Sequence, residues 1–189
     1  WDDVVPGMPA GREADAWVSD VLGQPARLIH LDDPYSRPVN PHRGQPGDVV
    51  SFADAYPVLL ASETSLAMLN DWIAEGPRSD EGPLEMARFR PNLVVRGAPA
   101  FDEDTWGRIR IGAASFRVVK DCDRCVLTTL DPITGAKQME PIATLARHRK
   151  WDGKTWFAVN LIPDVEDVVL RVGDPVEVLE RRTAGWAAA

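Results

Sequence analysis

Residues 122–135 read CDRCVLTTLDPITG, a closely spaced pair of cysteines followed by a β-prone run and a turn. The run at 126–130 contains β-branched residues of the kind that strands favour. The segment 131–135 has proline and glycine in positions typical of a turn. Since residues 115–120 form another β-prone run, we expect the two cysteines to lie between two strands.

Short β-prone runs continue on both sides of this segment. They cover residues 27–31, 57–61, 92–96, 108–111, 155–161, 168–172 and 176–180. Apolar side chains recur at helical spacing in three other segments, residues 12–22, 62–74 and 141–149, and these are predicted to be helices. We therefore expect an α+β fold that is rich in strands, with a closed or nearly closed barrel and two to three flanking helices.

The charge balance excludes several classes of protein. The 189 residues include 21 Lys+Arg and 29 Asp+Glu, a net charge of −8, which argues against general binding to nucleic-acid duplexes or anionic membranes, because both need a basic surface. No apolar run approaches the length of a membrane span. Two cysteines are too few for a disulfide scaffold and the N-terminus does not resemble a secretory signal, so we expect a cytoplasmic protein.

The length suits one domain with a single core. We assign residues 1–180 to this domain and residues 181–189 to a tail or linker. The chain begins at Trp1 rather than at a methionine. We therefore expect it to be a piece of a longer polypeptide.

The cysteine pair, Cys122 and Cys125, has three interpretations. A zinc site would need a second pair of ligands, but the chain has no other cysteine and its three histidines are scattered. A redox dithiol would need a helix directly after the motif, where a strand is predicted. The third interpretation is structural, with two small residues buried beside a charged turn. Spacing alone does not decide between this and a functional role.

Positive charge near Cys125 favours a functional role. Lys120 and Arg124 are close to it in sequence, and Arg88 or Arg90 would add to the cluster. Nearby cations favour the thiolate form of a cysteine, which binds soft metals or attacks electrophiles. We expect this cationic cluster to face an anionic ligand.

The arginines belong to a second motif, Arg88-Phe89-Arg90-Pro91-Asn92. Pro91 disfavours a helical conformation at Arg90, and in an extended stretch Arg88 and Arg90 would lie on one face. An arginine can grip a phosphate with two hydrogen bonds. The alternative is that these arginines balance nearby carboxylates, and for Arg88 we favour that alternative.

Together, these motifs resemble the MOSC domain, the C-terminal domain of molybdenum cofactor sulfurases. The similarity extends over roughly residues 11–179 and is closest to the branch that contains the amidoxime-reducing components and their bacterial relatives. The segments that carry it are residues 89–92 (FRPN), 101–106 (FDEDTW), 111–112 (IG) and 122–135. Upstream, residues 11–38 and 51–70 also resemble that branch.

The resemblance implies a molybdenum cofactor, Mo-molybdopterin, held by one cysteine thiolate. It places this catalytic residue and metal ligand at Cys125, with Cys122 as a neighbour. It makes Arg90 a contact of the pterin or its phosphate, and aligns Asp54 and Ala55 with a loop that lines the cofactor. The remaining candidates for cofactor binding are Asn92, Arg124, Arg88 and Asn160. Relatives often have glycine in place of Ala158, close to Asn160.

The resemblance also implies an oxidoreductase that reduces N-hydroxylated small molecules such as amidoximes and hydroxylamino-purines. Electrons would come from a donor protein or a fused ferredoxin-like domain, because the chain has no flavin motif and too few cysteines for an iron–sulfur cluster. An N-terminal β-rich domain of the same polypeptide would supply further cofactor contacts, so we expect weak cofactor binding without it. The alternative is a cofactor-binding or sulfur-carrier module of a molybdenum cofactor sulfurase.

Overall fold

The structure is a computed structural model that describes residues 4–165 and 167–187. The chain divides into two compact units, Trp1–Pro57 and Val58–Ala189. Each unit is described by itself. No helix in the described ranges is both long enough and apolar enough to cross a bilayer.

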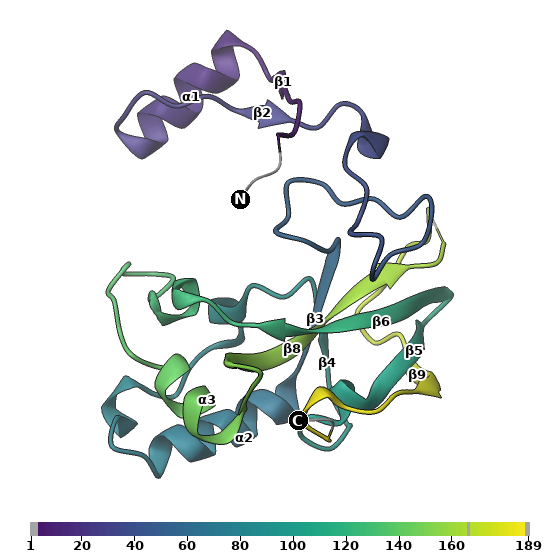
Figure 1. Ribbon diagram of the computed structural model, residues 1–189. Coiled ribbons are helices and arrows are strands. Elements are labelled where there is room, and N and C mark those ends of the chain that lie inside the picture. Colours follow the sequence, from purple (N-terminus) through teal and green to yellow (C-terminus); the bar gives the residue numbers. More distant parts are fainter. Residues whose placement is uncertain (1–3, 166, 188–189) are drawn as a thin grey trace. The chain divides into compact units, whose positions relative to one another are not determined.

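The first unit contains a helix between two short antiparallel strands (Figure 1). These elements are β1 (Met8–Pro9), α1 (Arg12–Leu22) and β2 (Ile29–His30). The helix has the bounds predicted from its apolar spacing, and it ends at Gly23, whose φ of 63° suits glycine. The Asp15 carboxylate accepts a hydrogen bond from the Leu28 amide at 2.9 Å, which ties the helix to the returning chain.

The second unit is built on a seven-stranded sheet that curls into a half-barrel (Figure 1). The strands follow the order β4-β3-β8-β6-β5-β9, and β7 pairs with β8. Their bounds are β3 Val58–Ser62, β4 Leu93–Val95, β5 Trp106–Ile111, β6 Ala114–Asp123, β7 Lys150–Trp151, β8 Lys154–Pro163 and β9 Val176–Arg181. The pair β3–β4 is parallel and all other pairs are antiparallel. The predicted α+β, barrel-like fold is confirmed, although the sheet stops at a half-barrel.

Two apolar clusters hold this unit together. The first lies among the strands and includes the buried side chains of Ile109, Phe116 and Leu161. The second joins the sheet to α2 (Glu63–Ala74) and α3 (Ile142–His148), the other two predicted helices. Strand β8 contributes to both clusters, which explains its continuous run of buried residues from 156 to 159.

Each of the two long central strands contains a one-residue bulge. The partners Val118↔Leu161 and Lys120↔Asn160 leave an extra residue in β6, and the partners Asp121↔Val159 and Asp123↔Trp156 leave one in β8. Bulges increase local twist and redirect side chains. The second bulge lies opposite the end of β6, which includes Cys122, and Cys125 follows two residues later.

Two of the predicted strands are wrong. Residues 126–130 form a 3-10 helix instead, Val126–Thr129, because the hydroxyls of Thr128 and Thr129 donate to the carbonyls of Cys125 and Val126 at 3.0 and 2.7 Å. Such local bonds compete with strand pairing. Residues 168–172 form no strand, and nearby the Arg171 amide donates to the Asp174 carboxylate at 2.8 Å to close a turn.

Candidate functional site

Cys125 lies at the start of the 3-10 helix Val126–Thr129, two residues beyond the end of β6. Its carbonyl oxygen accepts hydrogen bonds from the Thr128 hydroxyl at 3.0 Å and the Thr128 amide at 3.3 Å. These bonds fix the backbone while the cysteine itself is exposed. Its thiol has no hydrogen-bond partner among the described residues. The fold therefore presents an exposed cysteine on a turn held by hydrogen bonds.

The neighbouring Cys122 is in a different environment. It is half-buried, and its sulfur accepts a hydrogen bond from Nη1 of Arg124 at 3.0 Å. Burial raises the pKa of the Cys122 thiol, and Arg124 and a hydrogen bond with Asn160 only partly oppose this rise. The two cysteines are therefore not equivalent, because Cys122 is a neutral thiol held by the protein and Cys125 is accessible.

Arg124 directs its side chain into the protein. Its Nη2 donates to the carbonyl oxygen of Phe89 at 2.9 Å, and its guanidinium lies 5.6 Å from the centre of the Phe89 ring. Its backbone amide donates to the carbonyl of Thr155 on β8 at 2.8 Å. The residue predicted to bind cofactor is thus engaged with the 3-10 helix Met86–Phe89 and with strand β8.

Arg90 ends the 3-10 helix Met86–Phe89 and has left-handed backbone angles, φ 54° and ψ 44°. The predicted extended conformation at residues 88–90 is wrong. Its amide donates to the Ala87 carbonyl at 3.1 Å, so the chain closes a turn before Pro91. The Arg90 side chain is exposed, and within the described ranges its guanidinium has no partner. A left-handed residue other than glycine is uncommon and is a feature of functional sites.

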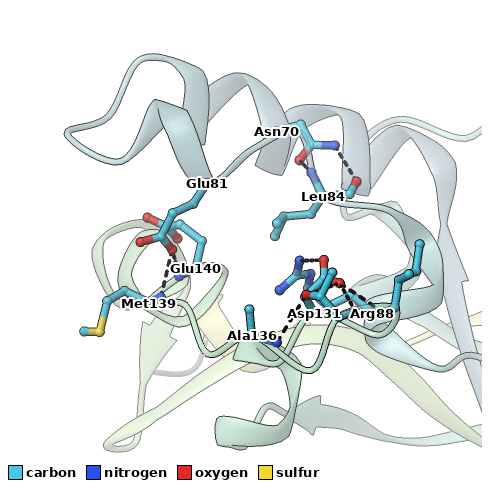
Figure 2. A network of polar contacts seen from close by, with 10 residues as sticks. Asn70, Glu81, Leu84, Arg88, Asp131, Ala136, Met139 and Glu140 are labelled. Atoms are coloured by element: carbon cyan, nitrogen blue, oxygen red, sulfur yellow. Dashed lines mark hydrogen bonds and ion pairs between the residues drawn. The ribbon is translucent and has the colours of Figure 1, made fainter.

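Arg88 lies on the opposite side of this turn. Its side chain is 6% exposed and forms an ion pair with Asp131 at 3.2 Å (Figure 2). Hydrogen bonds from the amide and hydroxyl of Thr134 hold the pKa of Asp131 below its usual range. Arg88 and Arg90 therefore do not share a face as predicted, since the 3-10 turn buries one and exposes the other. The ion pair with Asp131 agrees with the alternative favoured above for Arg88, in which the arginine balances a nearby carboxylate.

Two members of the cationic cluster expected around Cys125 are neutralised by ion pairs, and a third bonds within the protein. Lys120 forms an ion pair with Asp123 at 2.6 Å, Arg88 is paired with Asp131, and Arg124 bonds to uncharged acceptors inside the fold. In the described part of the chain, Arg90 is the member whose guanidinium has no partner. It is the one best suited to hold an anion.

The remaining predicted residues have local roles. The Asn92 side-chain oxygen accepts a hydrogen bond from the Leu59 backbone amide at 2.8 Å. The Asn92 backbone amide donates to the Leu59 carbonyl at 2.9 Å. These two bonds join β3 to the start of β4. Asn160 lies on β8 and bonds to Cys122. Asp54 and Ala55 belong to the first unit, where both are exposed.

Other contacts brace the segments around this site (Figure 2). The Asn70 side chain exchanges two hydrogen bonds with the backbone of Leu84, at 3.0 and 2.8 Å. The Glu81 carboxylate accepts the amides of Met139 and Glu140, both at 2.8 Å. The chain before Arg88 and the chain after Asp131 are therefore each fixed by polar side chains.

The residues present fit a cofactor that brings its own metal ligands. Among the described residues, no group of three or more His, Cys, Asp or Glu could hold a metal ion. A metal bound here would therefore take one soft ligand from Cys125 and the others from a non-protein group. An unpaired arginine such as Arg90 fits the phosphate of such a group.

A pocket of about 600 Å³ lies elsewhere in the second unit and includes none of the predicted residues. Part of its wall belongs to a continuous stack in which neighbouring groups are 4.0 to 5.4 Å apart. The stack runs in the order His148, Trp72, Phe101, Arg149, Trp151, Trp156. Arg149 also forms a buried ion pair with Asp104 at 2.6 Å. Sequence spacing gave no signal for this cluster, because its members come from separate elements.

The comparisons with known proteins agree with the motifs. The family model for the MOSC domain matches residues 47–177. Mitochondrial amidoxime-reducing component 1 of Homo sapiens is 34% identical over 188 residues, which cover 93% of this chain and 53% of the relative. The Danio rerio component 1 is 36% identical over 187 residues (91% and 54%), and the human component 2 is 35% identical over 185 residues (91% and 53%).

The chain spans about half the length of the curated relatives it matches. The predicted cytoplasmic location is contradicted by their names, which assign these relatives to the mitochondrion. That prediction rested on composition and on the absence of a secretory-like segment, and neither distinguishes the compartments inside a cell.

Proposed function

The chain belongs to the MOSC domain family, and from this premise we propose that it is the molybdenum-cofactor-binding domain of an oxidoreductase that reduces N-hydroxylated compounds. The observation that carries the proposal is the setting of Cys125. Its exposed thiol lies on a turn fixed by Thr128, and the half-buried Cys122 is engaged by Arg124. The names of the relatives, amidoxime-reducing components, support the reaction class.

In this proposal Cys125 holds the molybdenum and Arg90 holds the pterin or its phosphate. Asn92 joins the strand after Arg90 to β3, and the assignment of Asp54 and Ala55 to cofactor binding rests on the family resemblance alone. The bound cofactor would supply the two electrons that, with two protons, convert an amidoxime to an amidine and water. The protein residues hold and orient the cofactor, and the exposure of Cys125 leaves room for a small substrate.

The proposal includes two further partners. An electron-donor protein or a fused ferredoxin-like domain supplies electrons, because the two cysteines of this chain cannot hold an iron–sulfur cluster. The curated relatives are about twice as long as the matched region, and we assign further cofactor contacts to an N-terminal β-rich domain of the same polypeptide. The sulfur-carrier alternative has less support, since these relatives are named for a reduction.

The test is reduction of benzamidoxime by the full-length protein with a chemical electron donor. The wild type should contain molybdenum and form benzamidine, whereas Cys125→Ala should form none. Arg90→Lys keeps the charge but loses the two-pronged grip, so it should retain part of the activity, and Arg90→Met should lose most of it. A molybdenum-containing wild type that reduces no N-hydroxylated compound would overturn the proposed reaction and favour the carrier role.

A further inference from the structure

We infer that Arg124 is a positioning residue, which holds the turn that carries Arg90 against the loop that carries Cys125. It does so through two hydrogen bonds, one to the Phe89 carbonyl and one to the Cys122 sulfur. These two bonds are called the clasp below. The catalytic consequence of the inference rests on the proposed function. The clasp itself is a property of the cofactor-free protein and is tested there as well.

The two terminal nitrogens of Arg124 reach two different segments. Nη2 donates to the Phe89 carbonyl at 2.9 Å, and Nη1 lies 3.0 Å from the Cys122 sulfur. The Nε atom is buried without a partner among the described residues, although the residue as a whole is half-buried. A planar guanidinium makes two such bonds at a fixed angle, which a lysine ammonium on its flexible stem does not reproduce.

Both bonded segments end at a residue of the proposed site. Phe89 directly precedes Arg90, and Arg124 directly precedes Cys125. The Phe89 ring is fully buried and packs on Phe157 with ring centres 4.2 Å apart. The Arg124 backbone donates to the Thr155 carbonyl. Both ends of the clasp are therefore anchored on β8.

An ion pair holds the same turn from the other side. Arg88 reaches Asp131, which lies beyond the 3-10 helix that follows Cys125 (Figure 2). The turn at residues 86–90 is therefore held by Arg124, which precedes Cys125, and by Asp131, which follows it. Arg90 needs this support, because its left-handed backbone is disfavoured for a residue with a Cβ atom. Locally it is stabilised by one hydrogen bond, which the Arg90 amide donates to the Ala87 carbonyl.

The clasp predicts that the geometry of Arg124, rather than its charge, is what the site needs. Arg124→Lys conserves the charge and loses the two simultaneous bonds. A residue that contacts the cofactor through its charge would tolerate this change. A residue that aligns two loops would not.

The experiment compares full-length wild type with Arg124→Lys, and with Arg110→Lys as the matched control on the exposed part of β5. In cofactor-free protein, amide hydrogen exchange at residues 86–90 should be about tenfold faster in Arg124→Lys, the effect of losing one hydrogen bond of typical strength, and unchanged in Arg110→Lys. In the loaded enzyme kcat should fall several-fold with KM and molybdenum content retained.

The Cys122 variants test the second half of the clasp and serve if Arg124→Lys does not fold. Cys122→Ser keeps an acceptor and should leave the exchange at 86–90 near the wild-type rate. Cys122→Ala removes the acceptor and should accelerate it. Exchange at the wild-type rate in both Arg124→Lys and Cys122→Ala would overturn the inference. It would also be overturned if Arg124→Lys kept a normal kcat while Arg124→Gln, which removes the charge, lost its molybdenum, because the site would then need the charge of Arg124. If the wild type holds no molybdenum, the proposed function fails while the exchange rates still decide the clasp.

Discussion

Buried ionisable residues of this molecule differ in whether a partner of opposite charge stabilises them. Glu103 shows this most clearly, because it is fully buried and its carboxylate accepts a hydrogen bond from the Ser65 hydroxyl at 2.6 Å. Burial raises the pKa of Glu103 to about 7 from an ordinary value of 4.5. Between these pH values the native state keeps a proton that the unfolded state has released. The stability that this proton provides is complete below pH 4.5 and is lost as the pH rises through 7.

Glu103→Gln should flatten this pH dependence, since glutamine still accepts the bond from Ser65 and does not titrate. The free energy of unfolding of the wild type should fall by up to about 3 kcal/mol between pH 5 and 8 through this group, and that of the variant should not. Urea denaturation at several pH values measures the difference, with Glu177→Gln on the exposed strand β9 as the control. Equal slopes for wild type and Glu103→Gln would contradict the prediction.

Arg88 poses the opposite problem of a buried cation that depends on one partner. In cofactor-free protein, Asp131→Asn leaves the Arg88 charge buried, with Nε and Nη1 already lacking partners. Arg88→Met leaves only a half-buried carboxylate that the turn at Thr134 still stabilises. Asp131→Asn should therefore lower the free energy of unfolding more than Arg88→Met does. The reverse order in a thermal-unfolding series would show that Arg88 is not held mainly by Asp131.

Secondary-structure elements show where sequence patterns were sufficient. The three helices were predicted from apolar spacing and are confirmed. The segment after Cys125 was not, because Thr128 and Thr129 suit a strand in propensity but bond to the preceding turn. Likewise, nothing in the spacing around Arg124 reveals a bond to Phe89, 35 residues earlier. Such a contact depends on how the sheet brings distant segments together.

The bulge of β8 supplies a prediction at this scale. Ala158 is buried with a φ of 72°, a conformation that favours glycine. Ala158→Gly should therefore raise the free energy of unfolding by about 1 kcal/mol, the lower end of the cost of a left-handed residue with a Cβ atom. Chemical denaturation measures it, with Ala143→Gly in α3 as a control that should destabilise. A destabilised Ala158→Gly would mean that packing of the methyl group outweighs backbone strain.

At the scale of the whole molecule, the net charge of −8 conceals a site in which Arg90 is exposed and, among the described residues, its guanidinium has no partner. Family membership and the fold class could be predicted from the motifs, because the cysteine and arginine segments have a distinctive order and spacing. The different environments of the two cysteines could not be predicted from the motifs, because they depend on burial and on the contact with Arg124. The assignment of residues 1–180 to one domain remains a prediction, as does weak cofactor binding by this region alone.

The most direct test of the account is the molybdenum-to-protein ratio of the full-length protein in three forms, wild type, Cys125→Ala and Cys122→Ala. Because Cys125 is proposed as the only protein ligand of the metal, Cys125→Ala should lose most of its molybdenum, and Cys122→Ala should keep it. Cys125→Ala with the full wild-type ratio would contradict the assignment of the ligand and with it the proposed function.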